Sequence, residues 1–249
     1  MSSNGATRVA IITGATTGLG AATAELFARS GYRVLATALN DDGGFIAKLQ
    51  AQNLEIVFFP ADLRDAQKSA IAIVERSTQL YGRIDVVVNC AARISHKPVV
   101  EVEEADWDEI FAVNLKAPFF ISQSAFPHLS KTKGCIINIS STNAWRVNLK
   151  NQLYDSLKAA LNHLTKGLAL EFREADVRVN ALMPGAMRTP LIDEWLELYL
   201  GRAAEGADLQ GANVATPEMV AKVILGLATD EMRWINGAEI PVDGGYHLG

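Results

Sequence analysis

The chain has 249 residues, of which 49% are hydrophobic, and it carries a formal net charge of -5. A chain of this length and composition can bury one sizeable core, so we expect a single α/β domain over residues 1–249. The acidic balance argues against a nucleic-acid-binding surface, which needs clustered lysine and arginine. The chain does not open with a basic segment before an apolar stretch, and no run approaches the ~18 apolar residues of a membrane span, so we expect a cytoplasmic protein without a membrane partner.

Seven short runs rich in β-branched residues alternate with longer segments of helical periodicity. We expect strands at residues 8–12, 33–37, 55–59, 84–88, 135–139, 177–181 and 239–242. We expect helices at residues 19–30, 43–52, 65–81, 103–130 with a break at Pro118, 152–174 and 217–228. Near-continuous apolar strands between helices favour a doubly wound Rossmann domain, a parallel seven-stranded sheet with helices on both faces. Ligands bind such sheets at the carboxyl ends of the strands.

The first expected strand runs directly into a glycine-rich loop, Thr13-Gly-Ala-Thr-Thr-Gly-Leu-Gly20. Gly14 permits a tight turn, Gly18 lets the backbone approach a pyrophosphate, and Gly20 allows close packing. The amino terminus of the following helix supplies N–H groups and the positive end of a dipole. The strand before this loop and the helix after it indicate a phosphate-binding loop rather than a simple turn.

Cys90 and Cys135 each lie in an apolar, strand-like run. Two reduced, buried thiols are therefore expected, in preference to a disulfide or a metal site. The sequence shows no metal-binding constellation, so we expect no metal.

The sequence Tyr154-Asp-Ser-Leu-Lys158 places a tyrosine and a lysine four residues apart on a long expected helix. Both side chains then share one helix face. A lysine cation beside the phenol is expected to lower its pKa from about 10, which would let it exchange a proton with a substrate oxygen.

The longest stretch without a clear pattern runs from residue 188 to residue 215. It contains Trp195, Leu196, Leu198 and Tyr199 among acidic residues. A loop this long in a compact domain is usually a lid or a binding loop. We interpret residues 188–215 as a substrate lid with a short amphipathic helix, and an interface element is the alternative.

These motifs and their partners resemble the short-chain dehydrogenase/reductase family in its compact single-domain form. The resemblance covers essentially the whole chain. It rests on the glycine loop, Asp62, Asn89-Cys-Ala-Ala92, Asn114, Ser141, Tyr154 with Lys158, residues 178–185 with Thr189, and Asn236-Gly237 before residues 242–245.

The resemblance implies hydride transfer between NADP(H) or NAD(H) and a small carbonyl or secondary alcohol substrate. Tyr154 would be the general acid in reduction or the base in oxidation, and Ser141 would hold and polarise the substrate oxygen. The family spacing selects Ser141 over Ser140, because 154 minus 13 is 141. Lys158 would bind the nicotinamide ribose and tune Tyr154, and Asn114 would hold a water in a proton relay.

The resemblance also implies a set of cofactor contacts. They are Gly14, Thr16, Thr17, Gly18, Leu19 and Gly20 in the loop, Ala38 at the second strand, Asp62 and Leu63 at the adenine, Asn89 and Ala91 after the fourth strand, Tyr154 and Lys158, and Pro184, Gly185 and Thr189 at the carboxamide. The family usually has Asn-Asn-Ala-Gly where this chain has Asn89-Cys-Ala-Ala92. Ala92 would be strained if its site required a positive φ.

The choice of dinucleotide depends on the end of the second strand. Asp41 and Asp42 lie about 20 residues after the glycine loop, where a ribose-binding acid is expected. Alignment to NAD-preferring relatives, however, puts Ala38 at the place of that acid, and Asp41 and Asp42 then suit the start of a helix. The absence of a strand-end carboxylate favours NADP, with NAD as the alternative.

The substrate is less constrained. Arg93, His96, Trp145, Arg146 and Arg188 follow strands that border the site. Arg146 or Arg93 could grip an anionic substrate, and solvated loop arginines or subunit salt bridges are the alternative.

Two other functions remain open, a non-catalytic dinucleotide-sensing protein and an epimerase or dehydratase of related chemistry. The first would have no reason to keep Ser141, Tyr154 and Lys158 together, and the second has a longer chain and a differently spaced glycine loop. The resemblance also suggests a homotetramer or homodimer, built partly by the helices at 103–130 and 152–174.

Overall fold

The computed structural model describes residues 7–189 and 214–248. Its centre is a seven-stranded sheet of order β3-β2-β1-β4-β5-β6-β7, in which every neighbouring pair is parallel. The strands are β1 (Val9–Thr13), β2 (Arg33–Ala38), β3 (Ile56–Pro60), β4 (Val86–Asn89), β5 (Cys135–Ile139), β6 (Arg178–Pro184) and β7 (Glu239–Val242). The expected doubly wound fold is confirmed.

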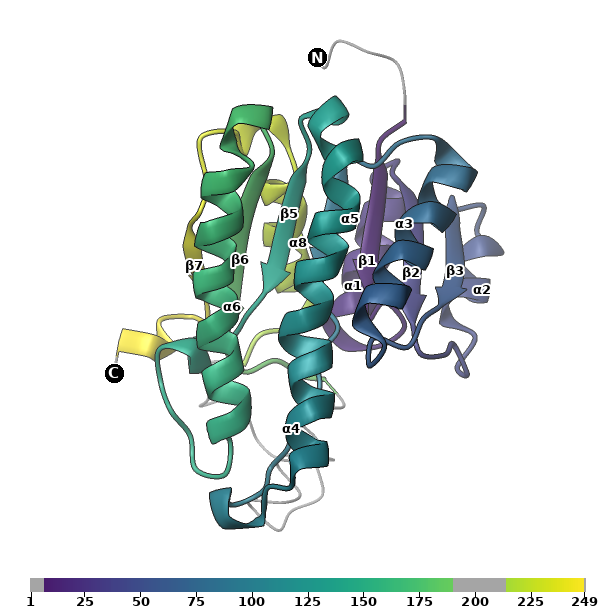
Figure 1. The fold of residues 1–249 in the computed structure, drawn as a ribbon. Coiled ribbons are helices and arrows are strands. Elements are labelled where there is room, and N and C mark those ends of the chain that lie inside the picture. Colours follow the sequence, from purple (N-terminus) through teal and green to yellow (C-terminus); the bar gives the residue numbers. More distant parts are fainter. Residues whose placement is uncertain (1–6, 190–213, 249) are drawn as a thin grey trace.

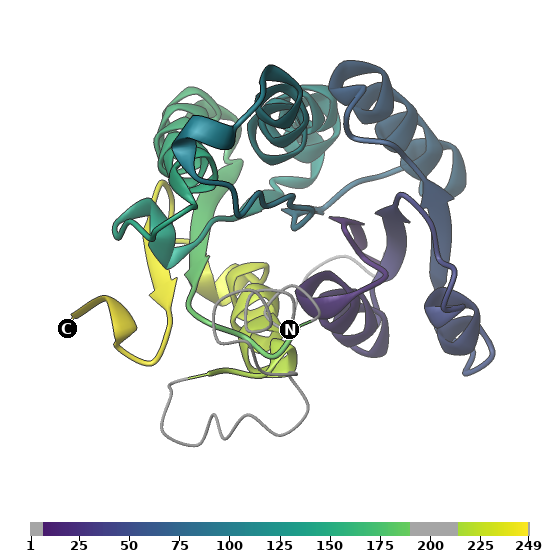
Figure 2. The same cartoon turned by 90° about the horizontal axis from the view of Figure 1, so that it is seen from below.

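Helices cover both faces of the sheet (Figures 1 and 2). One face carries α3 (Ala66–Tyr81), α5 (Ala117–Thr132) and α6 (Gln152–Glu171). The other face carries α1 (Gly18–Arg29), α2 (Phe45–Gln50) and α8 (Pro217–Leu227). Buried residues alternate along the strands accordingly, since Ala10 and Ile12 of β1 pack in one core cluster and Ile11 packs in the other.

The segment expected to form a helix at 103–130 is a continuous helical segment made of three consecutive elements. It consists of α4 (Glu104–Phe111), a π-helical turn (Ala112–Lys116) and α5. The interruption thus ends before Pro118, which was expected to mark it. Pro118 lies in the first turn of α5, directly after the π-helical turn.

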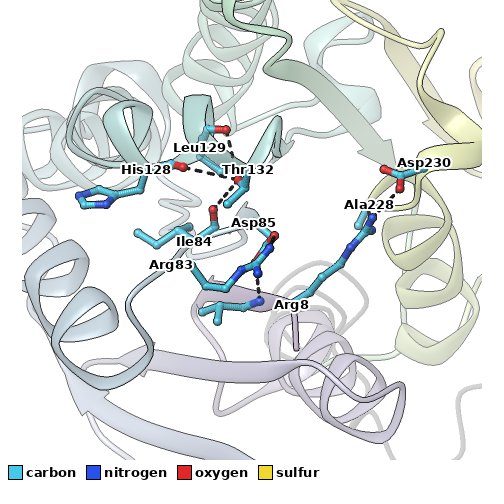
Figure 3. Close-up of polar contacts among 10 residues, drawn as sticks. Arg8, Arg83, Ile84, Asp85, His128, Leu129, Thr132, Ala228 and Asp230 are labelled. Atoms are coloured by element: carbon cyan, nitrogen blue, oxygen red, sulfur yellow. Dashed lines mark hydrogen bonds and ion pairs between the residues drawn. The ribbon is translucent and has the colours of Figure 1, made fainter. Parts of the chain in front are cut away.

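Ion pairs and hydrogen bonds hold the amino-terminal ends of the strands together (Figure 3). Asp85, directly before β4, accepts from the backbone N of Val9 at 2.8 Å and from Arg83 Nη2 at 2.6 Å. Arg8 reaches Asp230 at 2.6 Å. Thr132 donates to the carbonyl oxygen of Ile84 at 2.7 Å. These contacts anchor the starts of β1 and β4, the two strands whose other ends form the centre of the candidate site.

One local expectation needs correction. Cys135 is buried, but Cys90, which lies directly after the end of β4 at Asn89, is only half-buried. The condition that would strain Ala92 does not arise, because the non-glycine residues with positive φ in the described part of the chain are Asn53, Lys133, Lys150 and Asp176. Both thiols are free.

Within residues 7–189 and 214–248, no helix is both long and apolar enough to cross a membrane. The same residues contain no group of three or more His, Cys, Asp or Glu side chains placed to hold a metal ion.

Candidate active site

The candidate site lies at the carboxyl ends of β1, β4, β5 and β6, which point to the bottom of Figure 1. The strand order reverses direction between β1 and β4. A crevice at such a reversal is where doubly wound sheets bind ligands. The glycine loop after β1 and the amino terminus of α6 both open toward this edge.

At Gly14 and Gly20, the glycine loop packs so closely against the neighbouring backbone that a side chain would not fit. Gly14 and Gly18 have φ values of +66° and +52°. A Cβ on Gly20 would lie 2.0 Å from the carbonyl oxygen of Gly14, and a Cβ on Gly14 would lie 2.9 Å from the Cα of Ala91. Thr13 Oγ1 accepts from the backbone N of Ala91 at 3.0 Å. The loop is therefore packed directly against the segment after β4.

The helix that follows the loop has a free amino terminus. The side chain of Thr17 makes no capping hydrogen bond, and the first turn of α1 contains no acid. The first turn of α1 therefore has no side-chain cap from Thr17 and no acid that would repel a bound phosphate. Thr16 is half-buried and Thr17 is exposed, whereas the Leu19 side chain is in the core and leaves only its backbone for a cofactor.

The end of β2 supports the helix-start interpretation of Asp41. Its two carboxylate oxygens accept from the backbone N of Phe45 at 2.9 Å and of Ile46 at 3.0 Å, so it caps α2. Ala38 is the last residue of β2. The neighbouring Thr37 hydroxyl is buried and finds no hydrogen-bond partner among residues 7–189 and 214–248.

Other expected cofactor residues lie at the same edge. Asp62 forms an ion pair with Arg64, and Leu63 packs in the core. Asn89 donates to Asn138 Oδ1 at 2.8 Å, and its own Oδ1 is buried without a partner. 

On the far side of the site, Pro184 ends β6, and a Cβ on Gly185 would lie 2.8 Å from Asp243 Cβ. Thr189 lies against the loop, since a Cβ on Gly18 would be 3.3 Å from its Cγ2.

Three of the four expected catalytic side chains, Ser141, Tyr154 and Lys158, meet where β5 ends and α6 begins. Tyr154 and Lys158 lie on α6, with Lys158 Nζ 5.4 Å from the centroid of the Tyr154 ring. Lys158 donates to the carbonyl oxygen of Ile139 at 2.7 Å and is 2% exposed. Ser141 is half-buried and begins a short 3-10 helix (Thr142–Ala144). Its hydroxyl acts on the nearby Tyr154 phenol and lowers the tyrosine pKa.

Ser140, the neighbour of Ser141, has a hydroxyl that is already hydrogen-bonded within the protein. It is 4% exposed, and its hydroxyl donates to the carbonyl oxygen of Lys158 at 3.2 Å. Its hydroxyl is thus engaged in joining β5 to α6, which favours Ser141 as the serine that faces a substrate.

Burial controls the pKa values of this cluster. It raises the pKa of Tyr154, although the hydrogen bond with Ser141 opposes the rise. It lowers the pKa of Lys158 to about 8, since a buried ammonium is poorly solvated. The pKa of Tyr154 in the protein alone therefore shifts in the direction opposite to the expected one, because desolvation of the phenol is the largest influence on it. Burial also raises the pKa of Cys90 to about 12.

Asn114 lies in the π-helical turn and is 1% exposed. Its Oδ1 accepts from the backbone N of Arg93 at 2.9 Å, and its Nδ2 donates to the Arg93 carbonyl oxygen at 2.7 Å. Both polar ends of the amide are thus bound to the segment after β4. The π-helical turn, which sequence periodicity did not indicate, faces Asn114 toward that segment.

The candidate substrate cations have partners within the protein. Arg93 forms an ion pair with Glu109 at 3.3 Å. Arg146 donates to the carbonyl oxygen of Tyr246 at 2.6 Å and lies over the Tyr246 ring, 4.8 Å from its centroid. Trp145 donates to Glu239 at 2.6 Å. Arg93 and Arg146 are thus engaged within the protein itself, which neither the proposed grip on an anionic substrate nor the alternative of solvated arginines or subunit salt bridges predicted.

Most of the expected lid lies outside the described residues, since residues 190–213 are not described. Its two flanks are joined, because Arg188 N donates to the Ala215 carbonyl oxygen at 3.0 Å and Ala215 N donates to the Ala186 carbonyl oxygen at 3.0 Å. Sequence reasoning missed Asp155, a buried acid beside Tyr154. The one feature of the sequence that could have pointed to Asp155 is its position as an acid between Tyr154 and Lys158.

Comparisons with known proteins agree with this geometry. Residues 14–247 match a family model described as enoyl-(acyl carrier protein) reductase. The chain is 35% identical to the 3-oxoacyl-(acyl-carrier-protein) reductase of Thermotoga maritima, over 96% of this chain and 97% of the relative. It is 30% identical to the cyclopentanol dehydrogenase of Comamonas testosteroni, over 96% of each chain. The solved structure of the ligand-free aldohexose dehydrogenase of Thermoplasma acidophilum superimposes with a TM-score of 0.88 at 28% identity, covering 98% of this chain and 95% of that one.

The crowding at Gly20 leads to a testable prediction. Gly20→Ala forces a methyl group against the Gly14 carbonyl, so the loop must shift and dinucleotide affinity should fall at least about tenfold. Gly226→Ala in α8 is the matched control, because a Cβ there meets nothing within 4 Å. Titration of dinucleotide binding by fluorescence measures both variants. Equal affinity of Gly20→Ala and the unmodified protein would contradict the assigned role of the loop.

Proposed function

The chain belongs to the short-chain dehydrogenase/reductase family, and we propose that it transfers a hydride between a nicotinamide dinucleotide and a small carbonyl or secondary alcohol, with Tyr154 as the general acid or base. The observation that carries the proposal is the convergence of Ser141, Tyr154 and Lys158 beside an uncapped, glycine-rich helix start. Relatives over nearly the whole chain are named as dehydrogenases and reductases.

The residues present fit a dinucleotide. The glycine loop leaves no room for side chains, and α1 offers unpaired N–H groups for a pyrophosphate. Two buried polar atoms at the ends of β2 and β4, Thr37 Oγ1 and Asn89 Oδ1, have no hydrogen-bond partner in the described part of the chain. When bound, the nicotinamide supplies or accepts the hydride, which no protein side chain can do.

The protein would supply the proton and the orientation. A raised pKa keeps Tyr154 protonated at neutral pH, so the phenol is ready to donate to a carbonyl oxygen during reduction. Ser141, whose hydroxyl acts on the same phenol, would present a second donor to the same oxygen. The Lys158 cation beside the ring would stabilise the negative charge left on the phenol oxygen.

We propose NADP(H) as the preferred cofactor. Ala38, at the end of β2, places no carboxylate that would repel a 2′-phosphate, and Asp41 is already engaged in capping α2. The Thr37 hydroxyl is an unpartnered polar group next to that position.

We also propose that the protein forms a homotetramer or homodimer through α4, α5 and α6. An apolar groove of about 500 Å³ lies between them, lined by Phe111, Leu115, Phe119, Ala160 and Leu164 with Lys116 and His163. Phe111 and Phe119 are each 38% exposed, although they are large apolar side chains.

The two free cysteines suit a reducing compartment such as the cytoplasm.

Tyr154→Phe tests the reaction directly. Removal of the hydroxyl should lower kcat by about 10²–10⁴-fold, the usual contribution of a general acid or base, while dinucleotide affinity stays within about twofold. A panel of carbonyl and alcohol substrates, run in both directions with each cofactor, measures turnover. Retained turnover in Tyr154→Phe would remove this residue from its proposed role.

Ala38→Asp tests the cofactor preference. The added carboxylate should repel a 2′-phosphate and lower kcat/KM with NADP(H) by about tenfold or more, with a smaller effect on NAD(H). Asn40→Asp adds the same charge two residues further along and is the control. A strong preference of the unmodified protein for NAD(H) would overturn the proposal.

Sedimentation velocity at micromolar concentration tests the assembly. The unmodified chain should sediment as a dimer or tetramer, and Phe119→Glu should shift it toward monomer by placing a charge in the groove. Trp234→Glu, at a fully exposed site away from the groove, is the control and should leave the assembly intact. A monomeric unmodified chain would refute the proposed assembly.

A further inference from the structure

Asp155 is a buried carboxylate that the proposed reaction does not use. It follows Tyr154 on α6 and is 4% exposed. Among residues 7–189 and 214–248, no lysine, arginine or histidine forms an ion pair with it. Burial raises its pKa. A carboxylate that is buried without a cation depends on hydrogen bonds to compensate for lost hydration.

Both carboxylate oxygens of Asp155 bind the loop between β5 and α6. Oδ1 accepts from Asn143 Nδ2 at 2.7 Å, and Oδ2 accepts from the backbone N of Asn148 at 2.8 Å. We call this pair of hydrogen bonds the Asp155 tie. It connects the first turn of α6 to two points of the loop that are five residues apart.

The tie continues to Ser141. The backbone N of Asn143 donates to Ser141 Oγ at 3.1 Å, so Asn143 bonds the serine with its backbone and Asp155 with its side chain. A continuous path of hydrogen bonds therefore runs from the helix that carries Tyr154 to the hydroxyl of Ser141. The loop has little regular structure of its own beyond the 3-10 turn at Thr142–Ala144.

We propose that Asp155 is a positioning residue, which ties the loop that carries Ser141 to the helix that carries Tyr154, so that the two hydroxyl groups face one substrate oxygen. The inference rests on the proposed function, because it takes these two hydroxyls as the catalytic pair. Geometry of this kind matters to rate, since a displacement of about 1 Å at a reacting group can cost about 10²-fold.

A competing explanation is that the charge of Asp155 merely stabilises the start of α6 through the helix dipole. Asp155→Asn separates the two. Its carbonyl oxygen can still accept from Asn148 N, and its amide can donate to Asn143 Oδ1 once the Asn143 amide turns over. The variant keeps the tie and loses the charge, whereas Asp155→Ala loses both.

Steady-state kinetics measures the effect. Asp155→Ala should lower kcat by about 10–100-fold, with the KM for the dinucleotide within about twofold, because Asp155 acts through Ser141. Asp155→Asn should restore kcat to within about threefold of the unmodified enzyme. Glu171→Gln removes an exposed acid from the other end of α6 and should leave both kcat and KM unchanged. Full kcat in Asp155→Ala, or an equal loss in Asp155→Asn, would overturn the proposal.

Asn143→Ala breaks the branch of the tie that leads toward Ser141 and keeps the bond from the Asn148 amide to Asp155. It is the variant to measure if Asp155→Ala does not fold. It should lower kcat by a similar factor. The double variant Asp155→Ala/Asn143→Ala should be no slower than Asp155→Ala alone, because both changes break one path. Additive losses would refute a shared path.

Hydrogen exchange at the Asn148 amide reports the tie without any turnover. Asp155→Ala should speed this exchange at least tenfold, and Glu171→Gln should not. Unchanged exchange would refute the tie whether or not the proposed reaction is correct. Turnover by Tyr154→Phe would refute the proposed reaction and leave the exchange result to decide on the tie.

Discussion

Lys158 holds its ammonium group inside the protein, 2% exposed, with a hydrogen bond of 2.7 Å to the carbonyl oxygen of Ile139. In return, Ser140 donates from the end of β5 to the Lys158 carbonyl oxygen. These two contacts fix the register of α6 against β5. Tyr154, one turn earlier on α6, and Ser141, directly after Ser140, therefore reach the same place. A buried cation beside a buried phenol is costly to stability, and such arrangements are concentrated where a protein does chemistry.

The rest of the fold supports this cluster from a distance. The ion pairs of Arg83 with Asp85 and of Arg8 with Asp230 stabilise the amino ends of the strands, opposite the edge where the site lies. Glycines without room for side chains shape the loop after β1, and Asn114 fastens the segment after β4. Rigid strand ends and short, hydrogen-bonded loops can hold reacting groups with the accuracy that catalysis requires.

Local patterns predicted much of this structure. Alternating apolar strands and helices indicated the sheet, and the flanked glycine loop and the Tyr-Lys spacing indicated the site, because neighbours along the chain determine each of them. Three features were not predictable from local patterns, because each depends on how separate segments fold against one another. They are the π-helical turn at Asn114, the hydrogen bond from Arg146 to the Tyr246 carbonyl oxygen, and the Asp155 tie. The pKa of Tyr154 was predicted in the wrong direction because spacing reports the nearby lysine but not the extent of burial.

The proposed function depends most on the burial of Lys158. Titration of the Lys158 side chain tests that burial directly. Lysine labelled with ¹³C at Cε, with Lys158→Met to identify the resonance, gives its pKa by NMR. The structure predicts a value of about 8 for the protein without cofactor, because desolvation disfavours the ammonium. A value near 10.5, that of a solvated lysine, would contradict the buried cluster on which the proposed function stands.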